Sequence, residues 1–314
     1  MRSRSGRKVI LTLNQLTMWE LKNTPVQAGR IAIITGANSG IGYETAFGLA
    51  GKEMIIIMAC RDLQAAATAK IRILKSFPTA TIHVKHLDLS IQGSVKEFAK
   101  DFLATFDRLD LLINNAGIMM SPYKKTEDGF ENQLATNFIG HFALTGLLLQ
   151  ILKNTPHSRV ITLSSLSYKW APINFEDLHF SKGYNKKKAY GQSKRACLVF
   201  AFELNSRLAI AKVNTISLAA HPGLSKTNLD RYYPPLIRPL GILFLQSPKK
   251  GALPILYAAL KQDLKGGEYI GPDGFQEMRG NPNIVHSDKD TKDKVIATRL
   301  WEMAEKMTGV HYNF

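Results

Sequence analysis

Two residues that could exchange a proton with a substrate stand four positions apart, at Tyr190 and Lys194. In a helix this spacing places both side chains on the same face. A tyrosine phenol ionises near ~10, which is too high for a base at neutral pH. A nearby ammonium stabilises the phenolate and lowers that pKa. The pair is therefore typical of a group that gives or takes a proton at a carbonyl or alcohol oxygen.

A glycine-rich turn near the start of the chain predicts a phosphate site. An apolar, β-branched run over residues 31–34 predicts a buried strand. It leads into Thr-Gly-Ala-Asn-Ser-Gly-Ile-Gly at residues 35–42, and a helical pattern follows. Strand, turn and helix in this order bring backbone N–H groups against a phosphate. We expect Gly36 to permit the turn, Gly40 to admit a pyrophosphate, and Gly42 to let the helix pack closely.

Further motifs follow these two along the chain. They are Leu-Asp-Leu at 87–89, Asn-Asn-Ala-Gly at 114–117, Asn137, Ser-Ser at 164–165 and His-Pro-Gly at 221–223. Taken in this order, the motifs resemble those of the short-chain dehydrogenase/reductases, and the resemblance covers residues 30–310. Three segments most resemble the retinol dehydrogenase and WW-domain-containing oxidoreductase branch: Ala-Cys-Arg-Asp at 59–62, Ile-Asn-Phe-Glu-Asp-Leu at 173–178 and Leu-Trp-Glu at 300–302.

The resemblance implies a role for each matching residue. Tyr190 would be the acid and base, and Lys194 would lower its pKa and bind the nicotinamide ribose. Ser165, chosen over Ser164 by alignment, would donate a hydrogen bond to the substrate oxygen. Asn137 would order a water that links Lys194 to solvent. The cofactor would contact Gly36, Asn38, Ser39, Gly40, Ile41, Gly42, Arg61, Asp88, Leu89, Asn115, Ala116, Gly117, Tyr190, Lys194, Pro222, Gly223 and Thr227. We expect His141 to pack in the core rather than to relay a proton, and His221 to be structural.

The end of the second strand indicates which dinucleotide is used. An acidic residue there would bind the ribose hydroxyls of NAD and repel the 2′-phosphate of NADP. The position is expected to hold Cys60, followed by Arg61, whose planar donor fork suits a phosphate. Asp62 is near, but a helix N-cap is its simpler role. We therefore expect NADP rather than NAD.

Strand-like and helical segments alternate along the chain. The expected strands cover 31–34, 54–60, 81–86, 109–114, 159–163, 213–218 and 267–270, and the later helices cover 62–76, 94–106, 130–152, 188–210, 249–261 and 289–307. This alternation predicts an α/β fold, with about seven parallel strands in a doubly wound, Rossmann-type sheet and helices on both faces. The motifs then fall at the carboxyl ends of strands, where ligands bind in such folds.

Length and composition predict a single domain. The chain has 314 residues, of which 45% are apolar, and no linker-like stretch divides it. We expect a basic N-terminal extension over 1–29 and the dinucleotide-binding domain over 30–314. The two cysteines, Cys60 and Cys197, cannot build a disulfide framework, which favours a reducing, cytoplasmic setting. No metal is expected, and a homo-oligomer is the expected assembly.

The net charge of +16 favours anionic partners, and the dinucleotide is the expected one. No recognition-helix motif or basic–aromatic stacking segment indicates nucleic acid. A peripheral contact of the three lysines at 186–188 with acidic lipid is a further option. Apolar runs fall short of the ~20 residues that span a bilayer, although the resembled branch often has an N-terminal anchor. The basic first residues suggest a targeting segment, or translation that starts at Met18.

The substrate is predicted from residues 231–245, which are aromatic and aliphatic with three prolines. In the resembled fold this segment covers the substrate, so we expect an apolar aldehyde, ketone or alcohol, retinoid-like or steroid-like. The same residues could instead pack a dimer surface or touch a membrane. Two rival functions remain: a non-catalytic dinucleotide sensor or scaffold, and a protochlorophyllide-reductase-like enzyme. The latter usually has a cysteine within the motif found here at 114–117.

Overall fold

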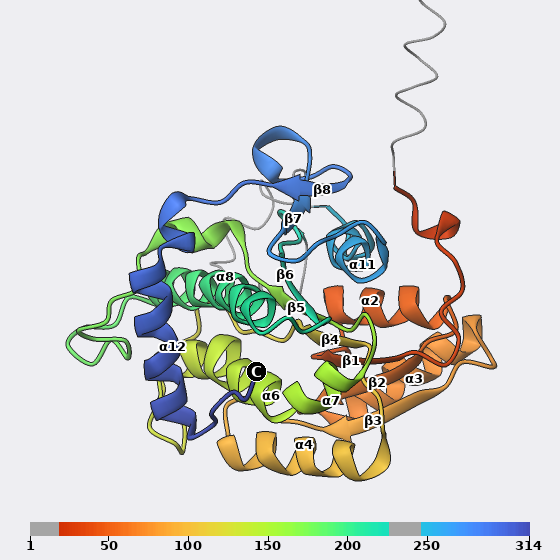
Figure 1. Cartoon of the computed structure of the whole chain (residues 1–314), viewed down its shortest axis with the longest axis horizontal. Coiled ribbons are helices and arrows are strands. Elements are labelled where there is room, and N and C mark those ends of the chain that lie inside the picture. Colours follow the sequence, from red (N-terminus) through yellow and green to blue (C-terminus); the bar gives the residue numbers. More distant parts are fainter. Residues whose placement is uncertain (1–18, 226–245) are drawn as a thin grey trace, which may run out of the picture.

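The computed structural model describes residues 19–225 and 246–314, and the account below concerns this part of the chain. Most of the basic extension, Thr227 and the apolar segment 231–245 lie outside the described residues. Strands and helices alternate as expected (Figure 1). The strands are β1 (Ile31–Thr35), β2 (Ile55–Cys60), β3 (Ile82–His86), β4 (Leu111–Asn114), β5 (Arg159–Leu163), β6 (Ile216–Ala220), β7 (Tyr269–Pro272) and β8 (Pro282–Val285).

The described strands form one sheet in the order β3-β2-β1-β4-β5-β6-β7-β8. Neighbours are parallel except for β7 and β8, which are antiparallel. In the centre of the sheet, Ala32 of β1 pairs with Ile56 on one side and with Leu111 on the other. Because the strand order reverses direction between β1 and β4, the carboxyl ends of these two strands border the crevice where such sheets bind ligands. The predicted doubly wound fold is confirmed.

One strand more than the seven predicted is present. β8 pairs with β7 at the edge of the sheet, with Ile270 opposite Ile284. The strand follows Gly280 and Asn281 and begins at Pro282, and two of its four residues are exposed. Such a segment has no alternating apolar pattern, so its sequence does not indicate a strand. Its position comes from pairing with β7.

Helices cover both faces of the sheet. They are α2 (Gly40–Ala50), α3 (Leu63–Ser76), α4 (Gln92–Thr105), α6 (Gly140–Leu147), α7 (Leu149–Asn154), α8 (Lys186–Ile210), α10 (Pro248–Gly251), α11 (Leu253–Leu260) and α12 (Lys294–Thr308). Side chains of β1 alternate between two apolar layers. Ile31 and Ile33 pack with α4, α6, α8 and α12, and Ala32 and Ile34 pack with α2, α3 and α11. Figure 1 shows α4 and α6 on one side of the sheet and α2 and α11 on the other.

The helix predicted over residues 130–152 is present at residues 132–154, but it is not one regular α-helix. The segment forms α5 (Asn132–Leu134), the π-helix η2 (Ala135–Ile139), α6 and the start of α7. The apolar spacing continues through this stretch, so periodicity does not reveal the wider turn. Such π-turns occur frequently at functional sites. Asn137 lies in the middle of η2.

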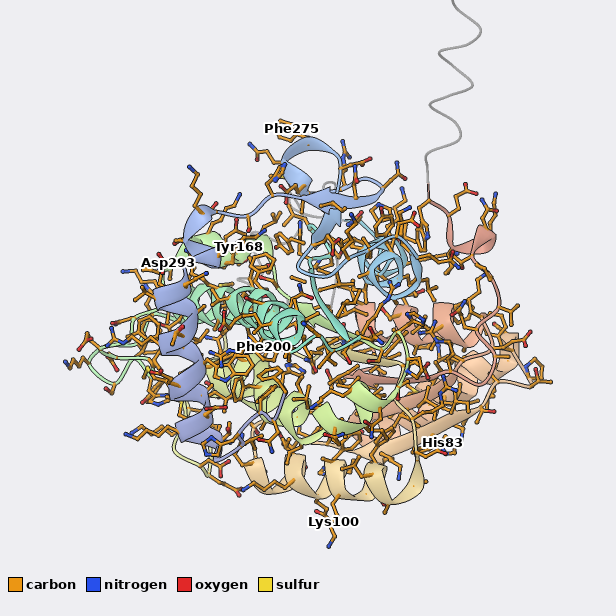
Figure 2. All side chains as sticks on the ribbon, viewed as in Figure 1. His83, Lys100, Tyr168, Phe200, Phe275 and Asp293 are labelled. Atoms are coloured by element: carbon orange, nitrogen blue, oxygen red, sulfur yellow. The ribbon has the colours of Figure 1, made fainter. Side chains whose placement is uncertain are left out.

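An aromatic cluster packs α8 against α6 and α12. Phe200 of α8 packs against Phe142 at 5.5 Å and against Trp301 at 5.9 Å between ring centroids. Tyr312 joins them and donates a hydrogen bond from its hydroxyl to the Phe142 carbonyl at 2.6 Å. Figure 2 shows Phe200 inside the molecule, whereas Phe275 projects from its surface. The helix that carries Tyr190 and Lys194 is therefore packed against an aromatic cluster.

Candidate active site

The turn after β1 has the backbone that the glycine motif predicts. Gly36 and Gly40 have φ values of +67° and +56°, which favour glycine. A Cβ on Gly42 would lie 2.4 Å from the Gly36 carbonyl oxygen, so the helix start packs on the turn itself. Among the described residues, Ser39 makes no side-chain capping bond, and the first turn of α2 has no acidic residue. The helix start is thus suited to an anion.

The end of β4 is tied to this turn through Thr35. The Asn115 and Ala116 N–H groups both donate to Thr35 Oγ1 at 2.9 Å. Asn115 Nδ2 also donates to the Thr35 carbonyl at 2.7 Å. A Cβ on Gly117 would lie 3.1 Å from Asn137 Oδ1 and 3.4 Å from Lys194 Nζ. The segment 115–117 therefore lies between the glycine turn on one side and Asn137 and Lys194 on the other.

The ends of β2 and β3 hold the residues expected to choose the cofactor. Cys60 is buried, and burial raises its pKa to about 11, although backbone hydrogen bonds from the glycine turn act in the opposite direction. Arg61 has a side chain that is 69% exposed, and its Nη1 lies 3.9 Å from Asp88 Oδ2. Asp62 accepts the Ala65 N–H at 2.9 Å and caps α3, as expected. Leu89, which follows β3, is buried.

α8 carries Tyr190 and Lys194, which are 4% and 5% exposed. The helix begins at Asn185, whose side chain accepts the N–H groups of Lys187 and Lys188. Lys194 Nζ donates to the Leu163 carbonyl at the end of β5, at 3.0 Å. Burial lowers the pKa of Lys194, and the charge of the nearby Cys197 thiolate would raise it. The lysine side chain is therefore buried at the carboxyl end of β5.

The two serines after β5 differ in position. Ser164 is buried, and its hydroxyl donates to the Lys194 carbonyl at 2.8 Å. Ser165 is half-buried and begins the 3-10 helix η3 (Leu166–Trp170), where its Oγ accepts the Ser167 N–H at 3.2 Å. The hydroxyl of Ser164 is thus engaged in a buried hydrogen bond, whereas the hydroxyl of Ser165 is partly exposed at the start of η3.

Asn137 connects several elements within the site. Its Oδ1 accepts the Ile118 N–H at 2.8 Å, and its Nδ2 donates to the Ile118 carbonyl at 3.0 Å. The same Nδ2 lies 2.9 Å from the hydroxyl of Ser193, the neighbour of Lys194. The expected water between Asn137 and Lys194 stays a prediction.

The end of β6 carries the last motif. Gly223 has a φ of +63°, and a Cβ there would lie 2.4 Å from the Met278 carbonyl. The Pro222 carbonyl accepts hydrogen bonds from the side chains of Ser225 and Gln246, the two residues that flank positions 226–245. His221 is buried against the Tyr269 ring, and burial lowers its pKa. These contacts agree with a structural role for His221.

A pocket of about 560 Å³ lies one helical turn before Tyr190. Its lining consists of Met120, Pro122, Tyr184, Asn185, Lys186 and Lys187. Gln133, which is buried, shapes it: its side chain accepts the Met120 N–H and donates to the Tyr184 hydroxyl and the Lys186 carbonyl. Nothing in the sequence indicates this role for Gln133, because glutamines are common on helices and its three partners are brought together only by the fold.

A second residue near the pocket, Trp170, was also missed by the sequence analysis. The Trp170 ring lies 6.0 Å from the Tyr190 ring, and Lys187 Nζ lies 4.9 Å from the Trp170 centroid.

The described residues contain no cluster of His, Cys, Asp or Glu that could hold a metal ion. Within the same residues, every helix is too short or too polar to cross a bilayer.

Known proteins are similar in sequence to this chain. The short chain dehydrogenase family profile matches residues 30–235. Retinol dehydrogenase 14 of Mus musculus is 40% identical over 300 residues, spanning 90% of this chain and 86% of that protein. Retinol dehydrogenase 13 of Homo sapiens is 38% identical over 293 residues, spanning 90% and 85%.

Solved structures have the same fold. An uncharacterized protein from Mycobacterium Paratuberculosis has a TM-score of 0.80 at 38% identity, covering 95% of this chain and 100% of that one. The Pseudomonas aeruginosa RhlG/NADP complex has a TM-score of 0.62 at 24% identity, covering 77% and 94%, which supports the fold alone. The chain therefore belongs to the short-chain dehydrogenase/reductase family, in its retinol dehydrogenase branch, whose members are oxidoreductases acting on CH–OH or C=O groups.

Proposed function

We propose that this oxidoreductase interconverts an apolar aldehyde or ketone and its alcohol, with NADP as hydride carrier and Tyr190 as acid and base. The observation that carries the proposal is the burial of Tyr190 and Lys194 on one face of α8, with Lys194 next to Gly117 in the segment that is hydrogen-bonded to Thr35 at the start of the glycine turn. That turn suits a pyrophosphate, because two of its glycines have positive φ values and the helix start is uncapped in the described residues. The bound dinucleotide supplies or accepts the hydride.

The residues of the chain handle the proton and the charge on oxygen. In reduction the Tyr190 hydroxyl gives its proton to the substrate oxygen, and in oxidation the ionised hydroxyl takes it back. The positive charge of Lys194 stabilises the phenolate. Ser165 donates a hydrogen bond to the substrate oxygen as negative charge develops there. This choice is supported by Ser164, whose hydroxyl already donates to the Lys194 carbonyl.

Three residues support NADP over NAD. β2 ends in Cys60, a buried neutral thiol, where an NAD enzyme would have a carboxylate. The carboxylate of Asp62 is engaged in capping α3. The exposed guanidinium of Arg61 can therefore receive the 2′-phosphate in its donor fork. By the family resemblance, we also assign Asp88 to the adenine edge of the cofactor.

The pocket before Tyr190 supports an apolar substrate. Met120, Pro122 and Tyr184 give it an apolar wall, and Trp170 extends this wall to Tyr190. Relatives at 38–40% identity are named for retinol, an apolar alcohol. We infer a retinoid-like or steroid-like carbonyl, with Lys186 and Lys187 at the pocket rim.

The test is NADPH oxidation by the purified protein against a panel of apolar aldehydes and ketones. Tyr190→Phe should lower turnover by roughly 10²-fold or more, because the proton donor is lost, while NADPH binding changes only a few-fold. Tyr257→Phe is the matched control, because Tyr257 is buried in α11 against Trp19. Full activity in Tyr190→Phe would overturn the assignment. Tight NADPH binding without any turnover in the native protein would support the non-catalytic sensor.

A further inference from the structure

We propose that His141 is a positioning residue that connects the catalytic turn η2 to the cofactor-binding end of the sheet, by bridging Asn137 and Thr35. The inference rests on the proposed function, since it assigns a task within that site. His141 lies on α6, one turn after Asn137, and is 1% exposed. Its Nδ1 lies 2.8 Å from the Asn137 carbonyl oxygen, and its Nε2 lies 2.8 Å from Thr35 Oγ1.

The partners of the ring determine its tautomer. A carbonyl oxygen only accepts, so the hydrogen must be on Nδ1 of His141. In the neutral ring Nε2 is then an acceptor, and the Thr35 hydroxyl donates to it. The lone pairs of Thr35 Oγ1 remain for the N–H groups of Asn115 and Ala116. Each of these polar groups has a partner suited to it, and only one tautomer satisfies them all.

The charge state of the ring agrees with this arrangement. The pKa of His141 is lowered to about 4: burial is the largest cause, the hydrogen bond with the Asn137 carbonyl opposes it, and the charge of Lys194 also lowers the pKa. The titratable groups that α8 places near the bridge are Lys194 and Cys197. A neutral ring keeps Nε2 as the acceptor that the Thr35 hydroxyl requires.

Further contacts hold the same turn. Cys197 Sγ of α8 donates to the Asn137 carbonyl at 3.1 Å. The carbonyl of His141 accepts the Thr145 hydroxyl at 2.7 Å, and Thr145 in turn accepts from Asn114 Nδ2 at 3.0 Å. The turn that aims the Asn137 side chain at Ile118 and Ser193 is thus connected to β1, β4 and α8. Simple core packing would not require this set of directed bonds.

The bridge joins the two parts that the reaction must align. Thr35 holds the glycine turn and the end of β4, where we place the dinucleotide, and Asn137 borders Lys194, where we place the proton transfer. A displacement of about 1 Å between reacting groups can lower a rate by roughly 10²-fold. Loss of the bridge should therefore reduce kcat more than cofactor affinity.

The variants separate the two halves of the bridge. His141→Leu removes both bonds and should lower kcat by roughly 10- to 100-fold, with NADPH affinity within about threefold. His141→Asn keeps a donor for the Asn137 carbonyl, and His141→Gln keeps a polar group near Thr35, so each should restore part of kcat. Thr35→Ser keeps the hydroxyl and should retain most of kcat, whereas Thr35→Val should not. Thr45→Val, at a buried threonine of α2, is the control for the loss of a hydroxyl.

A double-mutant cycle tests the coupling directly. In a bridge, Thr35→Val combined with His141→Leu should lower kcat little more than the worse single variant does. Additive losses, or a lower melting temperature with kcat within about twofold, would overturn the positioning role. If His141→Leu does not fold, the Gln and Asn variants and Thr35→Val still decide the question.

A spectroscopic readout needs no turnover. Nitrogen-15 NMR of the native protein should show Nδ1 of His141 protonated and Nε2 unprotonated, unchanged between about pH 5 and 8. The opposite tautomer, or titration in that range, would contradict the bridge. If no substrate is turned over but this signature is present, the proposed function fails while the bridge stands.

Discussion

The residues that we propose transfer the proton and the residues that we propose select the cofactor are held differently. Tyr190, Lys194 and Asn137 are each at most 5% exposed and lie against several elements. Arg61 instead has a side chain that is 69% exposed, and its ion pair with Asp88 spans 3.9 Å. The first group belongs to the core. The second group, Arg61 and Asp88, lies at the solvent-exposed carboxyl ends of β2 and β3, called the rim below.

This difference follows from what each group must do. Proton transfer requires donor and acceptor within hydrogen-bond distance, so the groups gain from a rigid setting. A phosphate carries its charge on several oxygens, and a long arginine can meet it from a range of positions. Substitutions in the core should therefore change kcat, and substitutions on the rim should change cofactor affinity.

The largest effect is expected for Lys194→Met. The variant removes the charge that stabilises the Tyr190 phenolate, so kcat should fall by roughly 10²- to 10⁴-fold. Residual alcohol oxidation should rise with pH, because the phenol must now ionise without help. Steady-state rates over a pH series measure both effects. Lys188→Met, at an exposed lysine in the first turn of α8, is the control, and equal losses in the two variants would contradict the comparison.

The glycine turn joins the two regions, and Gly42→Ala tests that junction. The added Cβ would lie 2.4 Å from the Gly36 carbonyl oxygen and 2.5 Å from Asn115 Nδ2, so the turn must move. We expect the unfolding free energy to fall by about 1–3 kcal/mol, and NADPH affinity to fall at least tenfold.

Gly93→Ala is the matched control for that change. A Cβ there meets no atom within 4 Å, and the residue lies in α4. Helix propensity alone should raise the unfolding free energy by about 0.5–1 kcal/mol. Chemical denaturation measures both variants, and similar destabilisation of both would show that close packing at Gly42 is unimportant.

The sequence predicted much of this arrangement because its signals are local. An apolar strand, three glycines and a helix indicate a phosphate turn wherever they occur in that order. Tyr190 and Lys194 share a face because their spacing is helical. The parallel order of the strands follows from the alternation of strand and helix.

The rest depends on contacts between distant parts of the chain. The π-turn at Asn137 is held by His141, whose ring contacts Thr35 106 positions away, and by Cys197, 60 positions from Asn137. Contacts over such separations leave no periodic pattern in the sequence. β8 forms because β7 offers an edge, and Gln133 acquires its three partners only in the fold. The sequence-based expectation that His141 packs in the core was incomplete, since burial alone does not show which groups its nitrogens contact.

The smallest expected effect is on the rim. Arg61→Ala should weaken NADPH binding by roughly tenfold and NADH binding by no more than about twofold, since only NADPH has a 2′-phosphate. Turnover at saturating NADPH should hardly change, because Arg61 lies away from the catalytic residues. Arg61→Lys keeps the charge but not the planar fork, so an intermediate affinity would show that geometry contributes. Equal losses for the two cofactors would mean that Arg61 does not meet the phosphate, and a drop in kcat would erase the distinction between rim and core.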